Sequence, residues 1–213
     1  MKTIPLYFLL IAGALTASAA ETNLTRHCCC AVPEAAAAAP AAVSDKSLYQ
    51  LDADWTNDFG AAVKLASLRG RPQIVTMFFA NCTYACPLLV YQMKQIEAAL
   101  PEALRGKVGF TLVSFDPERD SPAVLHNYRI QHALGSEGWT LLHGNSNAVM
   151  DLAALLNVKF KRDAQGQFLH SNVITLLNPD GEIVCQQLGL GSSNEEIVRR
   201  AVELTRKDGL ARN

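Results

Sequence analysis

The sequence has almost no net charge and no internal repeats. Nineteen lysine and arginine residues balance twenty aspartate and glutamate residues, so the 213-residue chain has a formal net charge of −1. Proteins that bind nucleic acid or an anionic membrane surface electrostatically carry an excess of basic residues. The composition therefore gives no support to a nucleic-acid partner, and the lack of repeats excludes a repeat array.

Long apolar runs are also scarce, and the main one lies at the N-terminus. Residues 4–15 are interrupted only by Pro5 and Gly13, and they follow the positive charge of Lys2. Ala17-Ser18-Ala19 provides the small residues that signal peptidase recognises. We therefore expect residues 1–20 to be a signal peptide and the protein to be exported to a periplasm. The alternative is an uncleaved anchor, because residues 4–20 just approach the lower limit of about 17 residues for a membrane span.

Residues 21–44 contain His27-Cys28-Cys29-Cys30 and then a tract of alanine and proline with few bulky apolar side chains. Such a composition cannot build a hydrophobic core, so we expect a flexible linker. Residues 45–213 are expected to form one folded domain. Membrane contact is expected only if the N-terminal segment stays attached.

Strand and helix patterns alternate along that domain. We expect strands at residues 74–79 and 108–115, helices at 88–100, 121–134 and 148–156, a hairpin formed by 173–177 and 182–186, and a last helix at 195–206. Asn178-Pro179-Asp180-Gly181 supplies the tight turn of the hairpin. This order is that of a thioredoxin-type sheet, whereas periodicity alone indicates an α/β domain with a hairpin late in the chain.

The chemistry is concentrated in Cys82-Thr83-Tyr84-Ala85-Cys86, which is followed by Pro87. The segment lies between the predicted strand 74–79 and the predicted helix 88–100, so both cysteines are expected to precede a helix. The helix N-terminus lowers the pKa of thiols placed there. Three intervening residues bring the sulfurs about one turn apart, close enough to share a soft ion such as Cu(I). A structural disulfide or two inert thiols is the alternative interpretation.

His170 is the candidate third ligand because it comes just before the predicted strand 173–177. In a thioredoxin-type sheet the loop that enters this strand lies opposite the cysteine loop, and an imidazole would let two thiolates hold Cu(II) as well. The other histidines of the domain, His126, His132 and His143, have no such position, and we interpret them as ordinary structural or surface residues.

Two further absences bear on disulfide exchange. Thiol–disulfide oxidoreductases of this fold usually have two residues between their cysteines and a cis-proline facing them. No pair of cysteines here has that spacing, and Ser171-Asn172-Val173 contains no proline. Metal binding is therefore favoured over disulfide exchange.

Taken together, these motifs resemble the Sco/SenC family of copper chaperones associated with cytochrome c oxidase assembly. The resemblance is carried by Cys82-x-x-x-Cys86-Pro87, by the segment 116–122 (Asp-Pro-Glu-Arg-Asp-Ser-Pro), by His170-Ser171 and by the turn 178–181. It implies a thioredoxin-like fold, with a central mixed sheet flanked by helices, and a site for Cu(I) or Cu(II) formed by Cys82, Cys86 and His170.

The implied function is that of a metallochaperone rather than an enzyme. Its partners would be a copper acceptor such as an oxidase subunit, and a copper donor or thiol reductant. The alternative is a thiol–disulfide reductase that uses Cys82 and Cys86 on the cysteines of an acceptor. Two positions depart from the family pattern: Thr83 replaces a proline, and Leu169 replaces an aspartate that would orient the histidine.

Three features remain outside this assignment. Cys28, Cys29 and Cys30 either capture Cu(I), form disulfides or have no role. Cys185 is expected to be a small buried apolar residue. Residues 116–122 are expected to act mainly in a turn and a helix start, with partner docking or tuning of the nearby site as the alternative.

Overall fold

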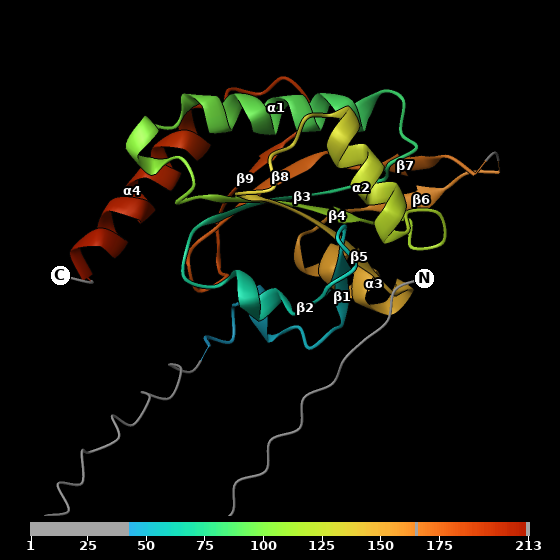
Figure 1. Ribbon diagram of the computed structural model, residues 1–213, viewed down its shortest axis with the longest axis horizontal. Coiled ribbons are helices and arrows are strands. Elements are labelled where there is room, and N and C mark those ends of the chain that lie inside the picture. Colours follow the sequence, from blue (N-terminus) through green and yellow to red (C-terminus); the bar gives the residue numbers. More distant parts are fainter. Residues whose placement is uncertain (1–42, 165, 212–213) are drawn as a thin grey trace, which may run out of the picture. The chain divides into compact units, whose positions relative to one another are not determined.

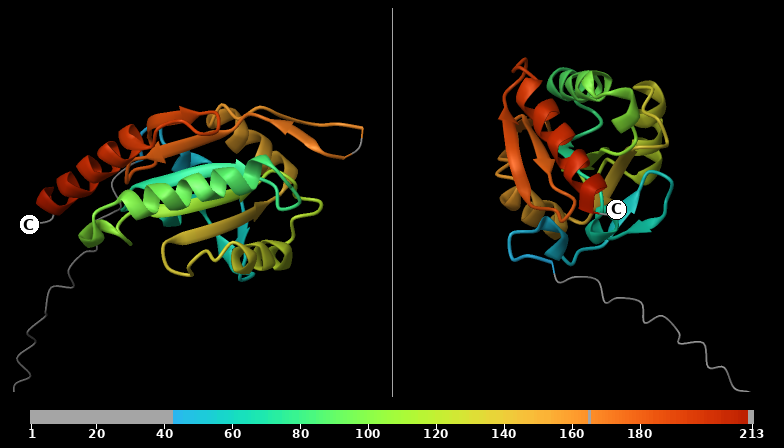
Figure 2. Two further views of the ribbon diagram at one scale, coloured as in Figure 1. Left: turned by 90° about the horizontal axis from the view of Figure 1, so that it is seen from above. Right: turned by 90° about the vertical axis from the view of Figure 1, so that its left-hand side faces the viewer.

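The fold is taken from a computed structural model that describes residues 43–164 and 166–211. Within this part a seven-stranded sheet has the strand order β2-β1-β5-β4-β3-β8-β9, and a separate two-stranded sheet pairs β6 with β7. The large sheet consists of β1 (Trp55–Asn57), β2 (Ala62–Val63), β3 (Gln73–Phe78), β4 (Gly109–Ser114), β5 (Trp139–Gly144), β8 (Val173–Leu177) and β9 (Ile183–Leu188). The small sheet consists of β6 (Phe160–Arg162) and β7 (Phe168–His170), which extend beyond the large one (Figure 2).

The sheet is mixed and its centre is covered on both faces. β3, β4 and β5 are parallel, whereas β1, β8 and β9 are antiparallel to their neighbours. Figure 1 shows one helix above the sheet and another below it, α1 (Ala85–Ala99) and α3 (Ser146–Leu155). Every residue of β3 and β4 is buried, as expected for parallel strands with helices on both faces. The remaining helices are α2 (Pro122–Gln131) and α4 (Glu195–Ala211).

The pairing of β3 with β8 determines where the candidate residues meet. The two strands are antiparallel neighbours, with Thr76 opposite Ile174 and Gln73 opposite Leu177. The end of β3 and the start of β8 therefore lie at the same edge of the sheet. The chain leaves β3 toward Cys82 and enters β8 from His170, so the two predicted ligand segments come together at this edge.

The predicted strands match β3, β4, β8 and β9, whereas β5 and the short strands were not predicted. The predicted strand 173–177 matches β8, and the predicted turn at 178–181 closes through the Gly181 amide and the Asn178 carbonyl at 2.9 Å. Gly181 has a φ of +86°, where a side chain would be strained. The predicted order omitted β5, the short pair β1–β2 and the hairpin β6–β7, and the predicted helix at 88–100 begins three residues earlier, at Ala85.

Helix starts follow the expected capping chemistry. The Ser121 hydroxyl accepts a hydrogen bond from the Val124 amide, with Pro122 at the first position of α2. The Asn145 side chain caps α3 through the Ala148 amide at 2.9 Å. Residues 116–122 therefore contribute to the start of α2 as expected. Asp116 and Asp120 in this segment also contact other parts of the chain.

A buried ion pair connects the end of β1 to α2. The side chains of Asp58 and Arg129 are almost fully buried, and the Arg129 guanidinium donates to both carboxylate oxygens, with one contact at 2.8 Å. The same guanidinium donates to the carbonyls of Gly135 and Trp139. The Nδ1 atom of His126 lies 3.5 Å from the Asp58 carboxylate, a partner that the sequence pattern did not indicate.

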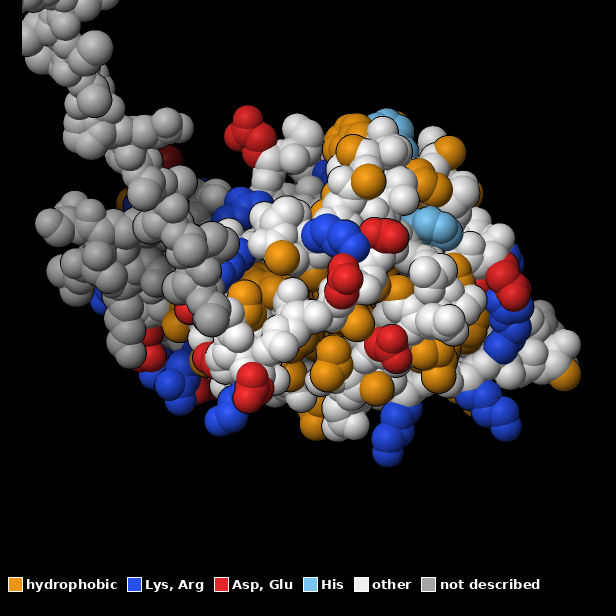
Figure 3. All heavy atoms as spheres, turned by 90° about the horizontal axis from the view of Figure 1, so that it is seen from below, with side chains coloured by type: hydrophobic (Ala, Val, Ile, Leu, Met, Phe, Trp, Pro, Cys, Tyr) orange, Lys and Arg blue, Asp and Glu red, His pale blue; other side chains and the backbone are white. Residues whose placement is uncertain are grey.

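None of the helices in the described ranges has both the length and the apolar composition to cross a bilayer. The predicted signal peptide, residues 1–20, and the predicted linker up to residue 42, with Cys28, Cys29 and Cys30, lie outside the described residues. On the face shown in Figure 3, basic and acidic side chains are interspersed rather than separated by sign.

Candidate metal centre

The cysteine loop connects β3 to α1. Cys82 is partly exposed in this loop, and its amide donates to the Phe79 carbonyl at 3.2 Å. Cys86 lies in the first turn of α1 and is fully buried in the core. The expectation that both cysteines precede the helix is therefore correct for Cys82 and wrong for Cys86, because the helix begins at Ala85.

The sulfur of Cys82 replaces the side-chain cap that α1 lacks. Tyr84 occupies the N-cap position without making a side-chain hydrogen bond, and the Cys86 amide donates to the Cys82 sulfur at 3.3 Å. Amide groups at a helix N-terminus have no partners within the helix and carry a partial positive charge. A negatively charged sulfur at Cys82 is stabilised by this environment.

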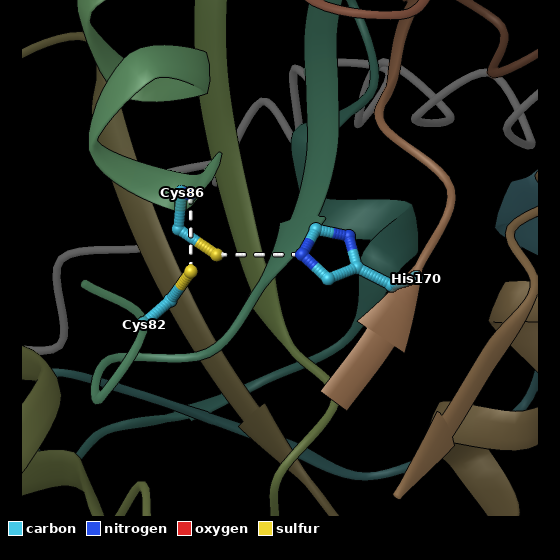
Figure 4. A group of neighbouring side chains, drawn as sticks. All are labelled: Cys82, Cys86 and His170. Atoms are coloured by element: carbon cyan, nitrogen blue, oxygen red, sulfur yellow. Dashed lines mark hydrogen bonds between the residues drawn. The ribbon is translucent and has the colours of Figure 1, made fainter. Parts of the chain in front are cut away.

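His170 brings an imidazole to the two sulfurs from the other side. It is the last residue of β7, and its Nε2 atom lies 3.9 Å from the Cys86 sulfur (Figure 4). The three possible ligand atoms of Cys82, Cys86 and His170 all lie within 4.8 Å of one another. Ligands bound to one first-row ion at about 2.0 to 2.3 Å, the values for zinc, lie within roughly 4.6 Å of each other. Small shifts are enough for these atoms to share an ion.

The orientation of the imidazole comes from its backbone neighbour and from aromatic rings. Its Nδ1 atom lies 3.2 Å from the Ser171 carbonyl, so a proton on Nδ1 leaves the Nε2 lone pair facing the sulfurs. The ring packs against Phe115 and Phe79, with centroid distances of 5.1 and 6.1 Å. These rings keep the imidazole on the cysteine side of β7.

Leu169, the departure from the family pattern, does not contribute to this orientation. Successive side chains of a strand point to opposite faces, so Phe168 and His170 share one face of β7 and Leu169 is on the other. Leu169 is 70% exposed. The loss of an aspartate at this position therefore leaves the contacts of the His170 ring with Phe115, Phe79 and Ser171 intact.

The two thiols differ strongly in acidity. The Cys86 thiol donates a hydrogen bond to Cys82, and with the backbone amides this lowers the pKa of Cys82 to about 4, although partial burial opposes the shift. The same hydrogen bond raises the pKa of Cys86, and burial raises it further. The expectation of two lowered pKa values is thus wrong for Cys86, because a proton shared between two close sulfurs stays with the buried one.

We expect this difference to appear in the pH dependence of alkylation. In the reduced, metal-free protein, iodoacetamide should modify Cys82 at a nearly constant rate between neutral pH and about pH 5, and at about half that rate near pH 4, where half of the thiolate is protonated. Cys86 should stay unmodified at neutral pH. Peptide mapping separates the cysteines, with Cys185 as the control because burial raises its pKa. A midpoint for Cys82 near 8 would contradict the proposed hydrogen bond.

The other candidate residues lie outside the group. Cys185 lies in β9 and packs against the core. It was expected to be buried, but it is only partly buried. The Nδ1 atom of His143 lies 2.9 Å from the Asp120 carbonyl, and the His132 ring packs on Tyr128. In the part of the chain that the structure describes, Cys82, Cys86 and His170 form the one cluster of three or more such side chains that could hold a metal ion.

Sequence reasoning missed the residues that surround the histidine. Phe79 and Phe115 end up beside its ring because they follow neighbouring strands, β3 and β4, and Phe168 is two residues away on the same face of β7. The alternation of Phe168 and His170 is a period-two pattern that was available in the sequence. A strand of only three residues was too short to be identified from it.

Comparison with known proteins gives a consistent result. Residues 43–206 match the family model described as SCO1/SenC. A SCO1 protein homolog of Bacillus subtilis (strain 168) is 27% identical over 146 residues, which cover 67% of this chain and 75% of the relative. A protein of Stutzerimonas stutzeri, whose name describes copper binding, is 29% identical over 121 residues, covering 55% of this chain and 58% of the relative.

Solved structures share the fold. The structure of ScoI from Bradyrhizobium japonicum with copper bound has a TM-score of 0.60 and 24% sequence identity, and the alignment covers 71% of this chain and 96% of that chain. The structure of yeast Sco1 with copper bound also has a TM-score of 0.60 and 24% identity, covering 72% and 86% of the two chains. The expected fold class, a mixed sheet flanked by helices in a thioredoxin-like arrangement, is confirmed.

Proposed function

Because this chain belongs to the SCO1/SenC family, we propose that it is a copper metallochaperone that holds one copper ion through Cys82, Cys86 and His170. The observation that carries the proposal is the convergence of two sulfurs and one imidazole nitrogen within 4.8 Å. Thiolates are soft ligands that favour Cu(I), and an added imidazole suits Cu(II). Solved structures of two proteins with this fold contain copper, which supports the same choice of metal.

The two sulfurs have different tasks in this proposal. Cys82 is already a thiolate at neutral pH and is partly exposed, so it is the sulfur that an incoming ion meets first. Cys86 keeps its proton until the ion arrives, because its pKa is raised by Cys82 and by burial. Binding therefore releases a proton from Cys86, and the affinity for copper falls as the pH falls.

Delivery follows from exchange of ligands at the exposed side. We propose that an acceptor with its own thiolate or imidazole ligands, such as an oxidase subunit, approaches Cys82 and takes the ion. The export signal in residues 1–20 and the linker in residues 21–44 would place residues 45–213 in the periplasm. A copper donor supplies the ion, and a thiol reductant keeps Cys82 and Cys86 reduced so that they can bind it.

A thiol–disulfide reductase is the second candidate, and the acidity difference favours it. The Cys82 thiolate would attack an acceptor disulfide, releasing one acceptor thiolate and forming a mixed disulfide. Cys86 would then lose its proton and attack Cys82, which releases the second acceptor thiolate and leaves a Cys82–Cys86 disulfide. Slow exchange by the reduced, copper-free protein would argue against this function without affecting copper binding.

A copper titration tests the metallochaperone function. In a variant with Cys28, Cys29 and Cys30 replaced by Ser, the reduced protein should bind about one copper ion per chain, and the Cu(II) form should show sulfur-to-copper charge transfer. The double variant Cys82→Ser/Cys86→Ser should remove that absorption, because no sulfur ligand remains. Cys185→Ser is the matched control and should leave it unchanged. Retention of the absorption in the double variant would show that the copper is bound elsewhere.

A further inference from the structure

The segment between β4 and α2, residues 116–120, contacts both halves of the candidate site. Its two aspartates, Asp116 and Asp120, are almost completely buried. From their contacts we infer that they are positioning residues, Asp116 for the hairpin that carries His170 and Asp120 for the loop that carries Cys82. The inference rests on the proposed copper function and assigns specific residues to the geometry of its site.

Asp116 holds the hairpin through arginine. Its carboxylate accepts hydrogen bonds from the Arg119 Nε atom and, at 2.7 Å, from the Arg162 Nη2 atom. Arg162 belongs to β6, which pairs directly with the strand that ends in His170. The Arg162 Nη1 atom donates to the Glu118 carboxylate at 2.7 Å, and Arg119 donates to the Gly166 carbonyl at 2.7 Å. Three hydrogen bonds thus join residues 116–119 to the hairpin, and the Arg119–Asp116 pair lies within the segment itself.

The same arginines also contact the group of aromatic rings that packs against the His170 imidazole. The guanidinium groups of Arg119 and Arg162 lie 5.7 and 5.0 Å from the centre of the Phe168 ring. Phe168 packs on Phe115 at 5.1 Å, and Phe115 packs on His170 at the same distance. A shift of the hairpin relative to Asp116 therefore moves the ring layer and the imidazole with it.

Asp120 holds the other half of the candidate site, the loop that carries Cys82. Its Oδ2 atom accepts a hydrogen bond from the Ala80 amide at 2.9 Å and another from the Ser114 hydroxyl at 2.6 Å. Ala80 lies two residues before Cys82, at the point where the chain leaves β3. Asp120 therefore anchors the start of the cysteine loop to the end of β4.

Stability alone is a weak reason for burying such groups. A buried carboxylate loses its hydration, and packed apolar residues of similar size often stabilise a protein equally well or better. Directional contacts from one rigid segment to two separate loops, in contrast, fix the distance between those loops. Partners of metal ligands commonly change affinity by about 10- to 100-fold when they are removed.

The test compares Arg162→Met with Lys161→Met in the full chain with Cys28, Cys29 and Cys30 replaced by Ser. Both substitutions remove one positive charge from an exposed position of the same strand, but Lys161 is opposite Leu169, away from the His170 face. Arg162→Met should weaken Cu(II) binding by about tenfold or more, and Cu(I) binding by less than about threefold, because the two sulfurs stay in place. Lys161→Met should leave both affinities unchanged, and Arg162→Lys should restore part of the loss.

A second measurement needs no copper. NMR relaxation of the His170 ring in the metal-free protein should show greater mobility in Arg162→Met than in Lys161→Met. For the other half, Asp120→Ala should weaken Cu(I) and Cu(II) binding together, since it releases the cysteine loop. An unchanged ratio of the two affinities and an unchanged His170 ring in Arg162→Met would overturn the inference. Absence of copper binding in the parent protein would reject the proposed function, while the ring mobility would still test the positioning.

Discussion

Replacing His170 with Ala is expected to weaken Cu(II) binding by at least about 100-fold, since loss of a ligand should exceed the effect of losing its partner. Cu(I) is expected to lose less than about tenfold, because two thiolates satisfy this soft ion. Among the described residues, the Nε2 atom of His170 is the imidazole nitrogen that groups with both sulfurs, at 3.9 Å from that of Cys86, and it could act as a ligand.

The measurement is a competition titration in each oxidation state, with His132→Ala as the matched control. The His132 ring packs on Tyr128 and lies outside the cluster. The control should bind both ions as the parent does. Equal affinities in His170→Ala and the parent would remove His170 from the site and leave a site of two sulfurs.

Replacing Arg129 with Met is expected to lower the free energy of unfolding by about 3 to 5 kcal/mol. The substitution leaves the Asp58 carboxylate buried without its cation, and it also leaves the carbonyls of Gly135 and Trp139 without their donor. Because Asp58 follows β1 and Arg129 lies in α2, the loss should affect the attachment of the sheet edge to this helix.

Urea unfolding of the metal-free protein measures this loss. Arg200→Met is the control, since Arg200 pairs with Glu196 on the exposed surface of α4 and should change the stability by no more than about 1 kcal/mol. The double variant Asp58→Leu/Arg129→Met should recover part of the stability, because no unpaired charge remains. A loss in Arg129→Met as small as that of the control would show that water reaches Asp58 in solution.

The central strands could be predicted from the sequence because their composition is determined by burial. Residues 74–79 and 108–115 are continuous runs of β-branched, aromatic and apolar side chains, and they match β3 and β4 to within one residue at each end. β5 was missed because Trp139, His143 and Gly144 make its pattern irregular, and β1, β2, β6 and β7 have only two or three residues each. Short strands are held by their neighbours rather than by their own periodicity.

For the site, the sequence indicated which residues meet but not how they differ. Cys82, Cys86 and His170 could be chosen from spacing and from the expected position of one loop beside another. The opposite shifts of the two thiol pKa values depend on which sulfur is buried, and this follows from the start of α1 at Ala85. The link from Asp116 to Arg162 spans 46 positions and leaves no pattern in the sequence.

In the proposed site the ligands are far apart along the chain, which would give a bound ion an additional effect. Cys86 and His170 are 84 residues apart, so copper held by both closes a long loop in the manner of a reversible cross-link. For a permanent bond around a loop of this size, the chain-entropy model gives roughly 4 to 5 kcal/mol of stabilisation. The metal-free protein is therefore expected to unfold more easily than the copper-bound form. The rate of proteolysis of a sample should then indicate what fraction of its molecules has copper bound.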